Sequence, residues 1–209
     1  MGPRERRQRE KDDTRQSILD AARELFVSEG YDGVSMRRIA EKIEYSPTAI
    51  YFHFKDKDTL IHALCDADFL TLAEQFAGAA RIPDPIDRII ATGRAYAEFG
   101  LTHPNHYRLM FMTPHEMRVS KTELDHGNPE EDAYAFLKST VAEGIAKGLF
   151  REEYGNDVEL ISQTFWAGVH GVISLEIAKH NDDWVEWATV QRRLETMINA
   201  LVTGLVKKG

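Results

Sequence analysis

Apolar residues recur at helical spacing from the first part of this chain onward. Beginning after Thr14 they fall at i, i+3 and i+4 intervals, at Ile18, Leu19, Ala21, Ala22, Leu25 and Phe26. This spacing gathers them into one stripe along a single helix face. By contrast, no segment alternates apolar and polar residues over five or six positions, as a half-buried strand would. The pattern therefore predicts an all-α protein.

Capping residues and helix breakers divide the chain into about nine predicted helices. Gly30 supplies a left-handed stop for the first helix, while Ser46-Pro47 and Asn128-Pro129 each combine a cap with a proline in the first turn. The stretch 113–129 has weak periodicity and indicates an irregular connection. The helices are expected over residues 14–29, 36–43, 47–54, from 58 onward, 86–101, 105–111, 129–147, 156–180 and 182–206.

Charge is distributed unevenly along the chain. The net charge of −8 by itself argues against nucleic-acid binding, but its distribution does not. Residues 1–58 hold 12 basic and 12 acidic side chains, so residues 59–209 carry the whole acidic excess. DNA binding depends on a local basic surface and not on the total. Residues 4–11, RERRQREK, hold five basic side chains against two acidic ones. This run fits either a frayed, solvated terminus or an arm that contacts phosphates.

The two short helices predicted over residues 36–43 and 47–54 are joined by a tight turn, as in a helix-turn-helix DNA reader. In such a pair the second helix lays its first residues against base edges. Thr48 can donate or accept a hydrogen bond there, and the methyl groups of Thr48 and Ala49 suit the thymine methyl. Tyr51 and His53, further along, can reach phosphates. A half-buried place in the core is the alternative for Tyr51.

The run ILDAARELFVSEGYDGVSMRRIAEKIEYSPTAIYFHFKDKDTL resembles the N-terminal domain of TetR-family repressors, along residues 14–61. Glu44 is a departure, because many members have glycine there, so either the turn differs slightly or Glu44 is strained. The shared marks are the ILDAA…LF…GYDG opening, the Ile39-Ala40 pair, Ser46-Pro47, Tyr51-x-His53-Phe54, Lys57 and Leu60.

The resemblance implies an N-terminal arm and three-helix helix-turn-helix DNA-binding domain in residues 1–61. A helical ligand-binding and dimerisation domain follows in residues 62–209. Core positions of the family are matched by Phe26, Ile39, Ile50 and Phe54. The positions that contact DNA in the family are matched by Ser35, Arg37, Ser46, Thr48, Ala49, Tyr51, His53 and Lys57.

The expected function is that of a ligand-responsive, sequence-specific transcriptional regulator. A repressor is favoured, one that binds a near-palindromic double-stranded operator as a homodimer and is released by a small apolar or amphipathic ligand. The alternative is a ligand-independent helical DNA-binding protein whose C-terminal core is fully packed.

Aromatic and sulfur-bearing side chains in the second domain are candidates for the ligand pocket. At helical spacing such residues belong to a packed core more often than to a pocket. The string FWAGVHGVISL resembles the Trp…His-Gly motif of one TetR C-terminal subgroup, and it puts Trp166 and His170 on one helix face. A histidine satisfied within the core is the alternative for His170. The candidate ligand-binding residues are Tyr96, Phe99, Tyr107, Met110, Phe111, Phe136, Trp166 and His170.

The last two predicted helices are long enough to form a subunit interface, which requires a self-complementary apolar patch. In the family the corresponding helices form a four-helix interface between subunits. A purely intramolecular role for these helices is the alternative. The candidate interface residues are Ala167, Gly168, Gly171, Val172, Leu175, Leu194, Ile198 and Leu201.

Catalytic chemistry finds little support, so we expect no enzyme, no cofactor and no metal site. Four histidines, His103, His106, His115 and His126, are enough to consider a metal, but no HExxH motif occurs. Pro104 separates the first two and disfavours a shared helical face.

The single cysteine, Cys65, cannot form an internal disulfide, which suits a reducing compartment. It is expected to be a small buried side chain, with a reactive thiol as the alternative. No apolar run has the length of a membrane span, and the charged N-terminus does not resemble a signal peptide. A cytoplasmic protein without a membrane partner is therefore expected.

Overall fold

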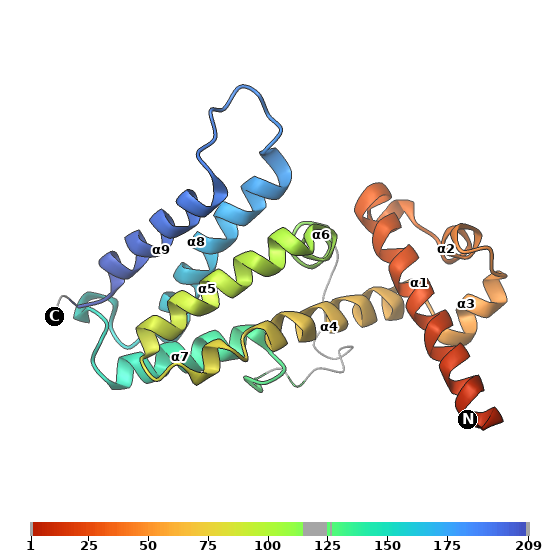
Figure 1. Cartoon of the computed structure of the whole chain (residues 1–209), viewed down its shortest axis with the longest axis horizontal. Helices are drawn as coiled ribbons and strands as arrows, with labels where there is room; N and C mark the ends of the chain where they lie inside the picture. The colour runs from red at the N-terminus through yellow and green to blue at the C-terminus, as the bar shows by residue number, and fades with distance from the viewer. Residues whose placement is uncertain (1, 115–124, 126, 208–209) are drawn as a thin grey trace. The chain divides into compact units, whose positions relative to one another are not determined.

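The computed structural model describes residues 2–114, 125 and 127–207. The predicted all-α fold of nine helices is confirmed over these residues, where the only β pairing is an isolated bridge between Phe150 and Val206. Two short 3-10 helices, η1 (Ala79–Arg81) and η3 (Glu152–Tyr154), lie between the longer elements. The α-helices, drawn in Figure 1, are α1 (Pro3–Gly33), α2 (Met36–Lys42), α3 (Pro47–His53), α4 (Lys57–Gln75), α5 (Pro85–Thr102), α6 (Pro104–Phe111), α7 (Ala133–Ala146), α8 (Val158–Lys179) and α9 (Val190–Leu205).

The described residues divide into two compact units. The first unit holds residues 2–68 and 105–114, and the second holds residues 69–104, 125 and 127–207. The domain boundary expected after residue 61 stays a prediction, because the units describe packing and α4 runs through both of them.

The first helix begins well before Thr14, where its start was predicted. Glu5 accepts a hydrogen bond from the Gly2 amide at 2.8 Å, and Arg6 pairs with Glu10 one turn later, also at 2.8 Å. Thr14 is no cap, since its hydroxyl donates to the Glu10 carbonyl inside the helix. Arginine, glutamate, glutamine and lysine are good helix formers, so this polar stretch extends the helix. The predicted stop is found at Gly30, which is non-helical with a φ of 75°.

The core of the first unit is formed by the apolar faces of its helices. The predicted core residues Phe26, Ile39, Ile50 and Phe54 are all buried, as expected. Asp68 on α4 contacts side chains of both α1 and α6. Its carboxylate lies 2.7 Å from Arg23 Nη2 on α1 and 2.9 Å from His106 Nδ1 on α6.

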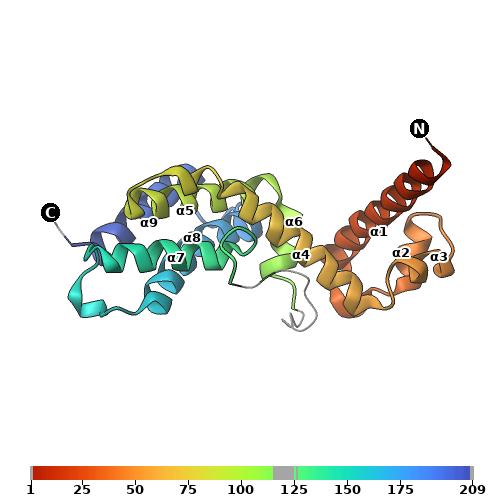
Figure 2. The same cartoon turned by 90° about the horizontal axis from the view of Figure 1, so that it is seen from below.

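In the second unit α8 packs against α5, α7 and α9 (Figure 2). Gly168 permits the close approach of α8 and α9, because a Cβ atom there would lie 2.6 Å from Leu201 Cδ1. The apolar cluster between these helices contains Ile89, Leu137, Val141, Phe150, Ile161, Phe165 and Leu205.

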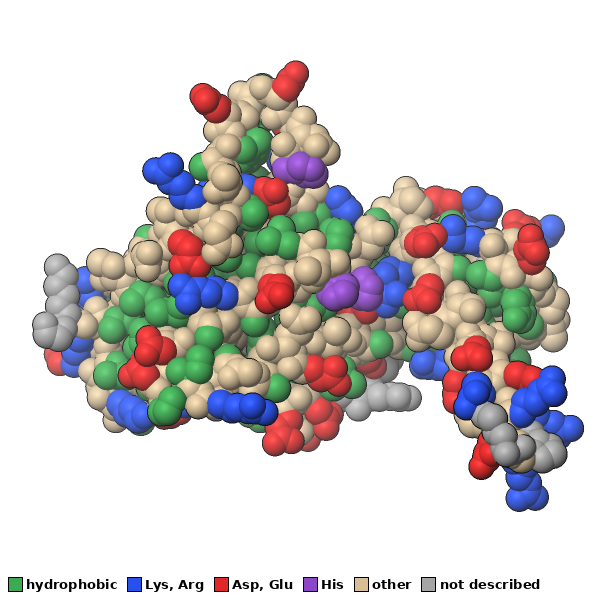
Figure 3. Space-filling view, in the orientation of Figure 1, with side chains coloured by type: hydrophobic (Ala, Val, Ile, Leu, Met, Phe, Trp, Pro, Cys, Tyr) green, Lys and Arg blue, Asp and Glu red, His purple; other side chains and the backbone are tan. Residues whose placement is uncertain are grey.

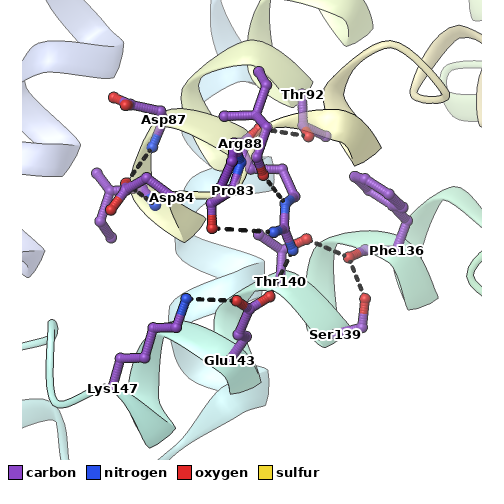
Figure 4. A network of polar contacts seen from close by, with 12 residues as sticks. Pro83, Asp84, Asp87, Arg88, Thr92, Phe136, Ser139, Thr140, Glu143 and Lys147 are labelled. Carbon is purple, nitrogen blue, oxygen red and sulfur yellow. Dashed lines mark hydrogen bonds and ion pairs between the residues drawn. The ribbon is translucent and has the colours of Figure 1, made fainter.

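A polar network joins the beginning of α5 to α7 (Figure 4). The Arg88 guanidinium donates to Glu143 Oε2 at 2.6 Å and to the Ile82 carbonyl at 2.9 Å. Lys147 also binds Glu143, at 2.7 Å. These two cations lower the pKa of the Glu143 carboxyl, with Lys147 as the larger cause.

Two further predicted helix starts are wrong. The seventh helix begins at Ala133 and not at 129, because Asp132 caps it by accepting from the Tyr134 amide at 2.8 Å. The ninth begins at Val190 behind its cap Thr189, so residues 182–189 are not helical. Trp184 in that connection is 80% exposed instead of contributing to a helix face.

No helix in the described part of the chain combines the length and the apolar character that a membrane crossing needs.

Candidate functional site

The turn between α2 and α3 contains Glu44, at the position where many TetR-family members have glycine. Glu44 has a φ of 58° and is the only non-glycine residue with positive φ in the described part of the chain. The left-handed conformation costs an ordinary residue roughly 1–2 kcal/mol. Of the two alternatives considered for Glu44, the structure supports a strained conformation.

Helix α3 has one anchored face and one open face. Ile50 is buried, as is Phe54 directly after the helix, and both hold it against the core. Thr48 is exposed on the open side, Ala49 is partly buried, and Tyr51 is 54% exposed, which rules out a core position for Tyr51.

Phe52 was missed by the sequence reasoning, although it is 74% exposed. Its distance of two positions from both Ile50 and Phe54 places it away from the buried stripe. The helical period of α3 was thus a sufficient signal to find it.

The two predicted serines act as helix caps. The Ser35 hydroxyl accepts from the Arg38 amide at 3.1 Å, and that of Ser46 accepts from the Ala49 amide at 3.2 Å. Both residues are exposed, and a hydroxyl that accepts in this way keeps its own proton for donation. Arg37 is also exposed. Its Nε atom donates to Glu41 Oε1 at 3.0 Å.

His53 lies in a basic setting at the end of α3. Burial lowers the pKa of its imidazole, and the nearby charges of Lys11 and Arg15 lower the pKa further. Its Nδ1 atom is buried and has no hydrogen-bond partner in the described part of the chain. The lowered pKa favours the neutral ring, whose N–H group can act as a hydrogen-bond donor.

Lys57, predicted to bind phosphate, has a structural role in addition. Its Nζ atom donates to the carbonyls of Tyr31 at 2.7 Å and Val34 at 3.0 Å. It also lies 4.1 Å from the centre of the Tyr31 ring. An ammonium has three donors, so one remains for a phosphate.

The N-terminal part of α1 lies beside α3. Lys11 Nζ is 5.6 Å from the centre of the Phe52 ring, and the Arg15 guanidinium is 5.1 Å from the centre of the Phe54 ring. The basic run and the open face of α3 therefore belong to one surface. Figure 3 shows Lys and Arg side chains in blue around the N-terminal end of α1, at the lower right.

Three of the predicted ligand residues form a connected group in the second unit. Trp166 Nε1 donates to Tyr96 Oη at 3.1 Å, and Tyr96 Oη lies 3.1 Å from His170 Nδ1. Trp166 is 38% exposed, and its ring centre lies 5.6 Å from that of Tyr134. Burial lowers the pKa of His170, which favours its neutral imidazole.

The other five predicted ligand residues are divided between the two units. Phe99 is buried, and Phe136 packs on Phe76 with ring centres 5.6 Å apart. The remaining three, Tyr107, Met110 and Phe111, belong to the first unit. A cavity of about 270 Å³ in the second unit is lined by none of the eight, and its lining residues are Ile145, Gly148, Phe150, Arg151, Glu152, Gly155, Asn156 and Lys207.

The predicted interface residues differ in exposure within the single chain. Ala167 and Leu175 are exposed, while Gly171 and Leu201 are partly buried. Gly168 faces α9 of its own chain, as described above. A further group is buried in the core of the single chain and offers little surface to a partner, namely Val172, Leu194 and Ile198.

No cluster of three or more His, Cys, Asp or Glu side chains suited to a metal occurs within residues 2–114, 125 and 127–207. His115 and His126 lie outside the described residues. Cys65 is buried, and this burial raises the pKa of its thiol, so the buried alternative is the one found.

Two family models match this chain. Residues 18–64 match the model described as "Bacterial regulatory proteins, tetR family". Residues 89–201 match the model described as "Tetracyclin repressor-like, C-terminal domain". Together these matches include both α3 and the Tyr96, Trp166 and His170 group.

Curated relatives match over the N-terminal part. The HTH-type transcriptional repressor AcnR of Corynebacterium diphtheriae is 43% identical over 63 residues, which are 30% of this chain and 33% of that protein. The HTH-type transcriptional regulator UidR of Escherichia coli K12 is 38% identical over 82 residues, 39% of either chain. The chain thus spans less than half the length of these relatives.

The fold as a whole matches solved structures. The crystal structure of a TetR family transcription regulator from Marinobacter aquaeolei VT8 has a TM-score of 0.72, with 97% of this chain and 100% of that chain covered. The sequence identity is 19%, so the likeness is one of fold.

Proposed function

This chain belongs to the TetR family of bacterial regulatory proteins, and from that premise we propose that it is a sequence-specific transcriptional repressor. The family is one of regulators and not of enzymes. The observation that carries the proposal is the open face of α3. Its Thr48 and Tyr51 are exposed while Ile50 anchors the opposite face, as reading base edges in a major groove requires.

The first test is selection of binding sites from a random duplex library with the full chain. A near-palindromic site should be enriched, with half-sites about 34–36 Å apart or a multiple of that distance. Thr48→Ala should then change the preferred base at one position of each half-site by about 1–3 kcal/mol. Because Thr48 is exposed, the Thr48→Ala protein should keep the thermal stability of the wild type. Failure of the wild type to enrich any sequence would contradict the proposal.

We further propose that the regulator acts as a homodimer through α8 and α9. The outward face of α8 supports this, since Leu160 and Leu175 are each 48% exposed and share that face with Ala167 and Gly171. These positions follow each other at intervals of seven, four and four residues, which places them along one side of the helix. A two-fold axis would place this side of the helix against its own copy.

The ligand that releases the operator is proposed to be small and apolar or amphipathic, and to contact Tyr96, Trp166 and His170. The arrangement of these three side chains supports the proposal. The partly exposed indole of Trp166 lies beside the Tyr96 phenol and the His170 imidazole, so the group offers apolar area together with a few polar atoms. The alternative, a ligand-independent protein with a packed core, is favoured by the complete burial of Phe99.

Thermal-shift screening of small apolar and amphipathic compounds separates these two possibilities. A compound that stabilises the protein should also release it from the selected operator. Trp166→Ala and His170→Ala should both weaken that release and leave operator binding by the free protein nearly unchanged. Trp184→Ala is the matched control, because Trp184 is exposed in a connection outside the group. If no compound acts, or if release survives both changes, the ligand site lies elsewhere or does not exist.

A further inference from the structure

The N-terminal extension of α1 is a helix that covers no core. All described side chains from Arg4 to Asp13 are exposed, and the first buried residue of the helix is Ile18. Most helices in proteins are stabilised by packing an apolar face. This segment lacks such a face, so its regular arrangement of charges calls for another explanation.

The basic residues of the extension fall on two faces. At about 100° per residue, Arg4, Arg7, Lys11 and Arg15 lie within a sector of about 80°. These four residues form what we call the basic stripe. Over about 16 Å of helix it presents one positive charge per turn. Arg6 and Arg9 lie on the opposite side of the helix.

The two faces also differ in pairing. On the opposite side Arg6 binds Glu10 at 2.8 Å, and Asp13 adds a further acid. No residue of the basic stripe forms an ion pair with any described residue. Within the described chain the four charges of the stripe are therefore free of ion pairs, whereas on the other face Arg6 is paired and Asp13 follows Arg9 by one turn.

The end of the stripe lies beside α3, where Lys11 reaches the exposed Phe52. Lys11 and Arg15, its last two members, are the ones that contact the rings of Phe52 and Phe54. A duplex that meets α3 therefore also meets the line of charges that leads away from it. Successive base pairs rise about 3.4 Å, so a stripe of about 16 Å spans nearly five of them.

We infer that the basic stripe binds the phosphate backbone of duplex DNA beside the bases that α3 reads, and so lengthens the contacted site. This inference rests on the proposed function, because it places the duplex against α3. Phosphate contacts position a protein without reading sequence. The stripe thus adds affinity and salt dependence, while Thr48 and its neighbours set the preferred bases.

Two double variants of the full chain carry the same change in charge on opposite faces. Arg4→Gln with Arg7→Gln removes half of the stripe, and Arg6→Gln with Arg9→Gln is the matched control. Glutamine is a good helix former, so circular dichroism should show the same helix content in both variants. Binding is measured to the selected operator and to a random duplex, over a range of salt concentrations.

The stripe variant should lower the slope of log K against log salt by about 1.8 units, the value for two lost phosphate contacts. The control should change this slope by less than half as much. Hydroxyl-radical protection should shrink at the outer ends of the operator in the stripe variant alone, and the selected sequence should stay the same.

Equal losses in both variants would indicate diffuse attraction and would overturn the inference, as would unchanged slopes. The random duplex separates this inference from the proposed function. If the wild type selects no operator but its binding to random duplex still depends on the stripe, the proposed function fails and the stripe remains a phosphate-binding surface.

Discussion

At the scale of single residues, the Lys57 side chain both stabilises the fold and is proposed to contact a DNA phosphate. Its ammonium satisfies the carbonyls of Tyr31 and Val34 after the break in α1. These groups lie at the point where the chain leaves the first helix and turns into α2. The geometry of the proposed DNA-reading surface therefore depends on a residue that has one donor left for a phosphate.

Lys57→Ala should lower the free energy of unfolding by about 1–3 kcal/mol, because two partly buried carbonyls lose their donor. Urea denaturation followed by circular dichroism measures this change. Lys55→Ala is the control, since Lys55 is exposed two positions earlier and should change stability by at most about 0.5 kcal/mol. Should Lys57→Ala keep full stability and only weaken DNA binding, its structural role would be refuted.

At the scale of elements, Asp68 joins α1, α4 and α6 through one buried carboxylate. Arg23 approaches it with Nη2 at 2.7 Å and Nε at 3.4 Å, and the exposed Asp20 holds the other edge of the guanidinium at 3.2 Å. The two acids thus bind the same arginine in different surroundings. A buried pair is costly to break, because removing one partner leaves the other charge without compensation.

Asp68→Asn should therefore lower the free energy of unfolding by about 3–5 kcal/mol. Asp20→Asn removes the exposed partner of the same Arg23 and should cost at most about 1 kcal/mol. Thermal or urea denaturation of both variants gives the comparison. Similar small losses in the two proteins would show that the Asp68 carboxylate does not hold the three helices together.

At the scale of the whole molecule, the proposed dimer depends on residues that the single chain leaves exposed. Val172, Leu194 and Ile198 are already buried in one chain, so a charge there would disrupt the fold before it tested an interface. Leu175 is a better probe, because half of its surface is free on α8.

Leu175→Glu should convert the dimer to a folded monomer, since it places an unpaired carboxylate in an apolar interface. Sedimentation velocity at micromolar concentration measures the change, and circular dichroism confirms the fold. Leu101→Glu serves as the control, because Leu101 is 39% exposed on α5 and should leave the dimer intact. A wild-type protein that sediments as a monomer at this concentration would contradict the dimer itself.

Local patterns in the sequence were enough for the helix-turn-helix unit. Ser46 caps its helix as predicted, Ser35 caps α2 in the same way, and Ile39 and Ile50 are buried as predicted. Caps and helical periodicity act within one or two turns, so neighbouring residues determine them. For the same reason the missed Phe52 could have been found from the period of α3 alone.

The tertiary structure decided which distant groups meet. Only the packed chain shows that Gly168 faces Leu201 of α9, that Lys57 binds the carbonyls of Tyr31 and Val34, and that Lys11 lies over Phe52. The sequence determined a basic run near the N-terminus but left its role open between a frayed end and an arm. Its alignment with α3 follows from the packing of α1 against the core, because contacts between residues far apart in the chain depend on how whole helices are placed.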